Sequence, residues 1–103
     1  MYVTSEEFIR YVILLTVVPG KTLTDDLIKA HVKHLKELDD KGLLVLCGPF
    51  TDYKGGMIII RAGSYEEAQK IAETDPFVKT GVETYELRTW ELSCEENNHM
   101  GMG

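Results

Sequence analysis

Apolar residues gather in blocks along the chain, and the spacing within each block predicts its secondary structure. Residues 8–18 are mostly β-branched or aromatic and end at a Pro-Gly turn, which predicts a first strand that is apolar on both faces. Residues 43–50 and 57–62 are two further apolar runs, separated by a polar loop that contains glycines, and this pattern is typical of a β-hairpin. The Val, Thr, Tyr and Trp content of residues 82–90 predicts the last strand.

Two segments show the spacing of helices. Residues 24–42 contain a capping threonine, acidic residues in the first turn, apolar residues at helical spacing and a closing glycine. Ser64 begins the second helix, because Ser64 and Glu67 form a capping-box pattern in which each side chain can satisfy the other's exposed amide. Pro76 is expected to end this helix at Asp75.

The predicted order is strand, helix, strand, strand, helix, strand. This order is typical of the α+β ferredoxin-like subunit (βαββαβ), in which two helices cover one face of a four-stranded antiparallel sheet. The other face would be bare, yet residues 8–18 and 57–62 are apolar, so a second copy of the chain is the simplest cover. We therefore predict a homodimer built as a dimeric α/β barrel, with further association left open. The alternative is a monomer whose residues 1–8 or C-terminal tail fold over the sheet, although both segments are polar.

Composition bounds the size and class of the protein. The 103 residues, 44% of them apolar, fit a single domain over residues 1–103, with a core at 8–92 and a flexible tail at 93–103. Lys and Arg total 11 against 17 Asp and Glu, and the net charge of −6 disfavours nucleic acid and anionic membranes as partners. Without a recognisable leader or membrane span, a cytoplasmic location is expected. Cys47 and Cys94 lack disulfide or metal-ligand spacing and are predicted to be free thiols.

Two ionisable side chains interrupt the apolar stripes of the predicted helices. His31 falls near the middle of the apolar arc of the first helix, and Asp75 continues the sheet-facing stripe of the second. Burying either group alone is costly, and a helix C-terminus disfavours negative charge. We therefore predict that they meet, with Asp75 orienting one imidazole nitrogen and the other nitrogen free to move protons. The alternatives are that the pair is only a structural anchor, or that Asp75 merely ends the helix.

Three segments resemble the YciI-like proteins, the family of the YCII-related domain. They are "AHVKHLKELDDKG" at 30–42, "CGPF" at 47–50 and "SYEEAQKIAETDPFVKTGV" at 64–82. In that family a helix histidine, a later Gly-Pro and an Asp-Pro-Phe recur at similar separations, and the combination is more specific than any one piece. By position, the family histidine falls on His31 and the family aspartate on Asp75.

The resemblance implies a dimeric α/β barrel with a His and Asp active site at the mouth of a cleft. One member acts as a dehydrochlorinase on a chlorinated hydroxyquinol, and related barrels include muconolactone isomerases. The resemblance thus implies acid-base chemistry, without metal or other cofactor, on a small cyclic or aromatic molecule. The residues assigned to substrate binding are Cys47, Gly48, Pro49 and Phe77. Members often carry Ser or Ala where this chain has Cys47, so no role for a hydroxyl is carried over.

Other chemistries have weaker support in the sequence. His31 and His34, with the aspartate, could hold a metal, but no further Cys or acidic residue joins them at ligand spacing. Cys47 could be a nucleophile, although a lone cysteine in an apolar strand is usually a small core residue. Arg61 and Arg88 could bind a substrate carboxylate, although arginines at strand ends are usually solvated.

The leading prediction is a lyase or isomerase in which His31 is the general acid or base and Asp75 fixes its tautomer. The alternative is a non-catalytic dimer that binds a small molecule or has a regulatory role. In that case the same pair of side chains only anchors the two helices.

Overall fold

A four-stranded antiparallel sheet forms one layer of the protein. The computed structural model describes residues 6–103. The strand order is β2-β3-β1-β4, and each neighbouring pair is antiparallel. The strands are β1 (Ile9–Val17), β2 (Leu44–Pro49), β3 (Gly55–Ile60) and β4 (Glu83–Glu91). The predicted α+β ferredoxin-like βαββαβ subunit is confirmed, and every predicted strand is present.

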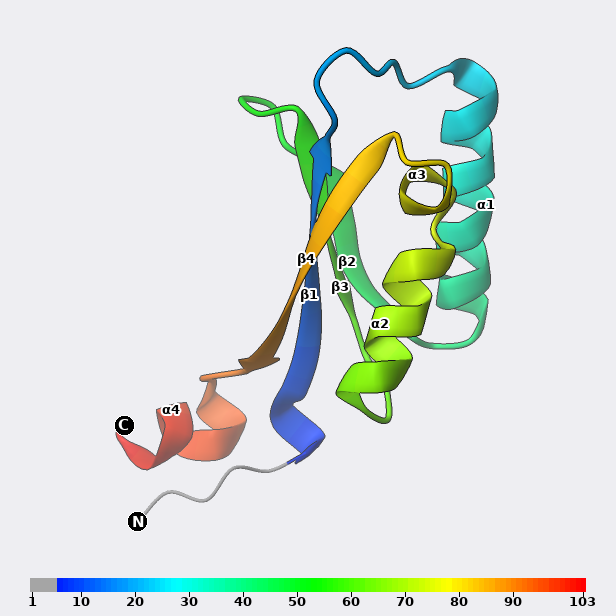
Figure 1. The fold of residues 1–103 in the computed structure, drawn as a ribbon. Helices are drawn as coiled ribbons and strands as arrows, with labels where there is room; N and C mark the ends of the chain where they lie inside the picture. Colours follow the sequence, from blue (N-terminus) through cyan, green and yellow to red (C-terminus); the bar gives the residue numbers. More distant parts are fainter. Residues whose placement is uncertain (1–5) are drawn as a thin grey trace.

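Three helices cover one face of this sheet (Figure 1). They are α1 (Asp25–Asp40), α2 (Tyr65–Thr74) and the short α3 (Pro76–Lys79). The first two correspond to the predicted helices, whereas α3 was not predicted. Short turns flank the sheet: a 3-10 turn at Glu6–Phe8 precedes β1, and a 3-10 turn at Glu95–Asn97 and α4 (Asn98–Gly101) follow β4.

The helices begin at the residues that the sequence marks as caps. The Thr24 hydroxyl accepts a hydrogen bond from the Leu27 amide at 3.2 Å, which satisfies one exposed donor of α1. The Ser64 hydroxyl accepts from the Glu67 amide at 3.1 Å. The reciprocal half of the predicted capping box is wrong, because the Glu67 carboxylate accepts from the Gly63 amide at 2.9 Å and not from Ser64. The carboxylate thereby satisfies a donor one residue further out and still closes the start of α2.

The core lies between the helices and the covered face of the sheet. Side chains of a strand alternate between its faces, so every second residue of β1 points toward the helices. Ala68 and Ala72 of α2 are almost completely buried, and their small side chains let that helix approach the sheet closely. The buried strand residues of the core are Tyr11, Ile13, Leu15, Ile58, Ile60 and Leu87.

The opposite face of the sheet is apolar and, among the described residues, carries no helix over its centre (Figure 1). Val12 pairs with Ile59 and Leu14 pairs with Met57, so these residues share that face. Leu46, which pairs with Ile59, is 68% exposed. The bare apolar face on which the dimer prediction depends is therefore present.

Residues 93–103, which the sequence predicts as a flexible tail, form local turns in the structure. The Asn97 side-chain oxygen accepts from the Cys94 amide at 3.0 Å and from the Met100 amide at 3.1 Å, which folds the segment into local turns. These turns lie beyond the end of β4 and do not cross the centre of the sheet (Figure 1). Residues 1–5, the other proposed cover of a monomer, lie outside the described residues.

Between residues 6 and 103, no helix has both the length and the apolar character needed to cross a bilayer. The longest, α1, has 16 residues and carries charged side chains along its outer face. Cys47 and Cys94 are free thiols, as predicted.

Candidate active site

A cavity of about 460 Å³ lies between α1, α3 and the β2–β3 half of the sheet. Most of its lining is apolar, and its volume falls within the range of small-molecule sites in proteins. The structure brings together around it all but one of the residues that the sequence analysis assigns to the site. These are His31, Cys47, Gly48, Pro49 and Phe77. The exception, Asp75, lies behind the imidazole of His31.

Glycines make room for this cavity on the sheet side. Gly48, Gly55 and Gly56 all line it, so β2 and β3 present backbone where other strands present side chains. A Cβ at Gly55 would lie 1.9 Å from the Leu15 carbonyl oxygen, and one at Gly56 would lie 2.8 Å from the Gly48 carbonyl oxygen. Only glycine therefore fits at positions 55 and 56 without moving the backbone of the neighbouring strand.

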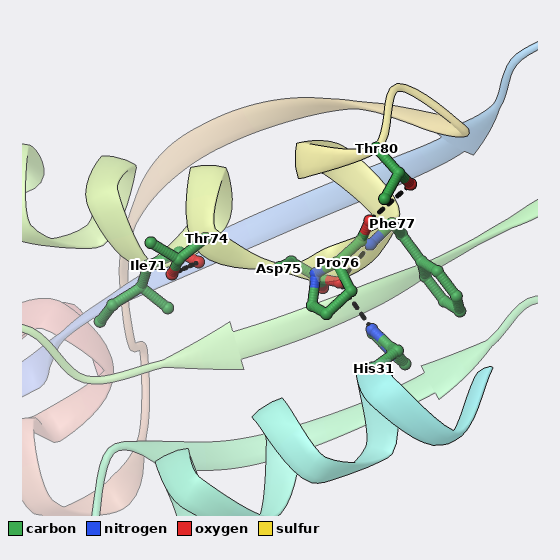
Figure 2. Close-up of polar contacts among 7 residues, drawn as sticks. All are labelled: His31, Ile71, Thr74, Asp75, Pro76, Phe77 and Thr80. Carbon is green, nitrogen blue, oxygen red and sulfur yellow. Dashed lines mark hydrogen bonds and ion pairs between the residues drawn. The ribbon is translucent and has the colours of Figure 1, made fainter. Parts of the chain in front are cut away.

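His31 and Asp75 are in direct contact, as the sequence analysis predicts. Nδ1 of His31 lies 2.8 Å from Oδ1 of Asp75, and the two residues come from α1 and from the junction of α2 and α3 (Figure 2). A carboxylate can only accept a hydrogen bond, so Nδ1 is the donor. Among the described residues Nε2 has no hydrogen-bonding partner, and the ring lines the cavity. The arrangement leaves the second imidazole nitrogen available to a molecule in the cavity.

The sequence Asp-Pro-Phe builds the support for the imidazole. Asp75 ends α2 and begins α3, and its Oδ1 also accepts from the Phe77 amide at 3.0 Å. Pro76 occupies the first turn of α3, where its missing amide hydrogen costs nothing. The Phe77 ring then stacks on the His31 ring, with centroids 3.9 Å apart and planes 11° from parallel (Figure 2). His31 is thus held by a hydrogen bond at its edge and an aromatic ring against its face.

The prediction that Asp75 lies only at the C-terminal end of a helix was incomplete. Pro76 ends α2, but the chain enters a new helical turn at once, so the carboxylate also caps the start of α3. This explains how a carboxylate that is 1% exposed is accommodated, because Oδ1 accepts two hydrogen bonds. Oδ2 is buried and has no hydrogen-bonding partner among the described residues.

Glu83 is a cavity residue that the sequence analysis missed. It is the first residue of β4, is 4% exposed and lines the cavity together with His31 and Phe77. Burial raises the pKa of its carboxyl, the negative charge of Asp75 raises it further, and His31 opposes both effects. Strand alternation could have revealed it, since Glu83 lies four residues before the inward-facing Leu87 on the same strand face.

Cys47 is not the small core residue that the sequence analysis favoured. It lies at the exposed edge strand β2, where its side chain borders the cavity. Local desolvation, with a smaller contribution from Asp39, raises the pKa of the thiol, which opposes formation of the thiolate. Cys47 is therefore better suited to contact a ligand than to attack one.

The remaining candidates lie away from the cavity. Arg61 and Arg88 are not part of its lining, and the Arg88 guanidinium pairs with the Glu86 carboxylate at 3.1 Å on the exposed surface. Over residues 6–103 no group of three or more His, Cys, Asp or Glu side chains is arranged to hold a metal ion. Burial lowers the pKa of His34, the other histidine considered for such a site.

Comparison with known proteins agrees with this fold. Residues 9–91 match the YCII-related domain. An uncharacterized protein, YjpA of Bacillus subtilis (strain 168), is 30% identical over 82 residues, which cover 80% of this chain and 96% of YjpA. A solved structure of 5-chloro-2-hydroxyhydroquinone dehydrochlorinase (TftG) from Burkholderia phenoliruptrix AC1100, in complex with 2,5-dihydroxybenzoquinone, is 25% identical. It superposes with a TM-score of 0.61 over 80% of this chain and 93% of that one.

Proposed function

This chain belongs to the YCII-related domain family, and from that premise we propose that its cavity is the active site of a lyase or isomerase. The enzyme would act on a small cyclic or aromatic molecule by acid-base chemistry, with no metal or other cofactor. A dehydrochlorinase is a lyase, and the likeness to that enzyme in sequence and fold supports the reaction class.

The observation that carries the proposal is the way His31 is held. Asp75 accepts the Nδ1 hydrogen, so the neutral imidazole presents the lone pair of Nε2 to the cavity. Nε2 takes a proton from the bound molecule, and the Asp75 carboxylate stabilises the imidazolium that forms. The Phe77 ring restricts rotation of the imidazole, so the base is oriented before the ligand arrives.

The lining of the cavity defines the class of ligand. Its side chains are mainly aliphatic and aromatic, and no Lys or Arg is among them. The Asp75 carboxylate lies behind the imidazole and no lysine or arginine lines the cavity, so an anionic ligand would find no cationic partner there. A neutral ring of the size of a hydroxylated benzene fits this environment better than a substrate that carries a carboxylate.

We also propose that the protein is a homodimer that buries the bare face of the sheet against the same face of a second copy. Val12, Leu14, Met57 and Leu46 form an apolar surface that no described helix covers. Further association of dimers stays open. A cytoplasmic location belongs to the same proposal, because both cysteines are free thiols.

The test is chloride release from 5-chloro-2-hydroxyhydroquinone under anaerobic conditions, in the wild type and in His31→Ala. Loss of a general base is expected to lower turnover by about 10²- to 10⁴-fold. Asp75→Asn should reduce turnover as well, because the amide does not carry the charge that stabilises the imidazolium. His99→Ala, an exposed histidine of the C-terminal turns, is the matched control and should leave turnover unchanged. Equal turnover in His31→Ala and the wild type would end the proposal.

A non-catalytic binding protein is the second candidate, because Asp75 has a structural task of its own. Its bond to the Phe77 amide holds the start of α3 whether or not the imidazole moves protons. If calorimetry shows saturable binding of a neutral hydroxyquinol while no tested hydroxyquinol is converted, this second function is favoured.

A further inference from the structure

We infer that Glu83 is the second proton-transfer group of the cavity, a carboxyl that holds a proton and gives it to the ligand while His31 removes another. This inference deepens the proposed function and rests on it. No part of the resemblance or of the dyad assigns a role to Glu83.

The Glu83 side chain faces the cavity because of its place on β4. Glu83 pairs with Val17 of β1 and lies on the helix-facing side of the sheet, in line with Leu87. Buried positions on this face of a strand normally carry apolar side chains, and Leu87 is an example on β4. A carboxyl that is 4% exposed is instead placed beside His31 and Phe77 in the same lining.

Among residues 6–103, no ion pair accounts for the burial of this carboxyl. The ion pairs formed by described residues join His31 to Asp75 and Arg88 to Glu86, and neither involves Glu83. Buried carboxyl groups that serve the fold alone are normally hydrogen-bonded or paired, because isolated burial of the charged form is costly. Glu86 lies on the same strand but on the exposed face, and its carboxylate accepts a hydrogen bond from the Arg88 guanidinium.

The surroundings favour a proton on Glu83. The groups whose charge acts on it are Asp75, from the α2–α3 junction, and His31 from α1, whereas β1 contributes the apolar Leu15 and Val17 to the same wall. Burial raises the pKa of Glu83 the most, and the nearby Asp75 carboxylate raises it further. Two titratable groups in different environments within one cavity are the usual arrangement of an acid and a base.

Movement of a proton within the ligand, as in an isomerisation or in a tautomerisation that precedes loss of chloride, uses one group to remove a proton and another to supply one. Nε2 of His31 takes a proton from an O–H or C–H bond of the ligand, and the freed electron pair moves into the ring system. Glu83 gives its proton to the ring carbon that gains the negative charge. Where chloride then leaves, it departs as the anion, and the accompanying proton passes through His31 to water. The step ends with an imidazolium and a carboxylate, which attract one another in the apolar cavity. Transfer of the proton from His31 to Glu83 through water restores both groups.

The first experiment is a carbon-detected NMR titration of the glutamate carboxyl groups, with Glu83→Gln and Glu86→Gln used to assign the two resonances. The expected result is that Glu83 keeps its proton to a higher pH than a free glutamate side chain, and that its titration moves to lower pH in Asp75→Asn. If Glu83 titrates like a free glutamate side chain, the inference is wrong.

The second experiment measures turnover of 5-chloro-2-hydroxyhydroquinone as a function of pH. Glu83→Gln cannot give up a proton and is expected to lower kcat by about 10²- to 10⁴-fold with a smaller change in KM. The fall in kcat at high pH, where Glu83 loses its proton, should disappear from the pH profile. Glu83→Asp should restore part of kcat and the fall at high pH, whereas Glu86→Gln should match the wild type. Wild-type kinetics in Glu83→Gln would overturn the inference.

The two experiments separate this inference from the proposed function. A wild type that converts no hydroxyquinol contradicts the proposed reaction class, and the inferred proton donation falls with it. The NMR titration would then show only whether Glu83 holds a proton. A wild type that converts the substrate with a dispensable Glu83 keeps the proposed function and removes Glu83 from it.

Discussion

The two ends of the helix-covered sheet face are packed in opposite ways. Beneath α2 the core is filled, and Ile60, Ala68 and Ala72 are no more than 1% exposed. Beneath the first half of α1 the same face is hollow, and Ile28 and Val32 are each 39% exposed beside the cavity. The buried carboxyl groups of the covered layer, Asp75 and Glu83, belong to the hollow end. The tightly packed core and the candidate site therefore lie at different ends of the same sheet face.

Matched truncations at the two ends should give the largest difference in stability. Ile60→Ala removes most of a fully buried side chain from the filled end and is expected to cost about 2–5 kcal/mol, because a cavity is left behind. Val32→Ala removes part of a half-exposed side chain at the hollow end and should cost less than about 1 kcal/mol. The free energy of unfolding in urea measures both. Equal costs would show that the hollow end is packed as tightly as the filled one in solution.

Two glycines of the cavity should respond differently to alanine. Gly56→Ala places a Cβ 2.8 Å from the Gly48 carbonyl oxygen, so strands β2 and β3 must shift, with an expected cost of about 1–3 kcal/mol. Gly48→Ala meets no atom within 4 Å and should fold with little change in stability. Thermal unfolding of the two variants compares them directly. A stable Gly56→Ala protein would show that the β2–β3 wall yields easily.

The smallest expected effect is the dependence of stability on pH at Glu83. Folding raises the pKa of this carboxyl, so its ionisation at higher pH costs more in the folded protein than in the unfolded chain. Below the pKa of the unfolded chain the carboxyl is neutral in both states and carries no penalty. The penalty develops as the pH rises through the folded pKa. The stability of Glu83→Gln relative to the wild type should therefore increase as the pH rises from the unfolded pKa through the folded pKa.

Urea unfolding of the wild type and Glu83→Gln at a series of pH values measures this difference. Glu86→Gln on the exposed face of the same strand is the control and should show no comparable gain. A difference between Glu83→Gln and the wild type that is flat with pH would show that the carboxyl is not desolvated.

The elements of the fold and the dyad were predictable because their signals are local. The spacing of apolar residues, the Thr24 and Ser64 caps and the β-branched runs each act within a few residues of the chain. His31 and Asp75 could be paired because each conflicts with its own helix stripe, and the two helices share one face of the sheet. Each is an ionisable side chain on an apolar stripe, and a contact between the two removes both unfavourable burials.

Other features of the site depended on contacts between segments far apart in the chain. Helix α3 was missed because the signal that ends α2 at Asp75 gives no hint that the same carboxylate starts a new turn. Cys47 was expected in the core because its neighbours are apolar, but β2 is an edge strand, and its exposure is decided by sheet order.

By itself, the sequence determined the βαββαβ order and the helix caps. It also placed two ionisable groups, His31 and Asp75, on apolar helix stripes where neither could be buried without a partner. The tertiary structure alone decided that a cavity exists, because a cavity depends on how α1, α3 and the glycines of β2 and β3 fail to fill the space between them. It also decided that Glu83 shares that cavity with His31, since their proximity is set by packing across the sheet. Periodicity assigns a side chain to a face, whereas only packing assigns it a neighbour.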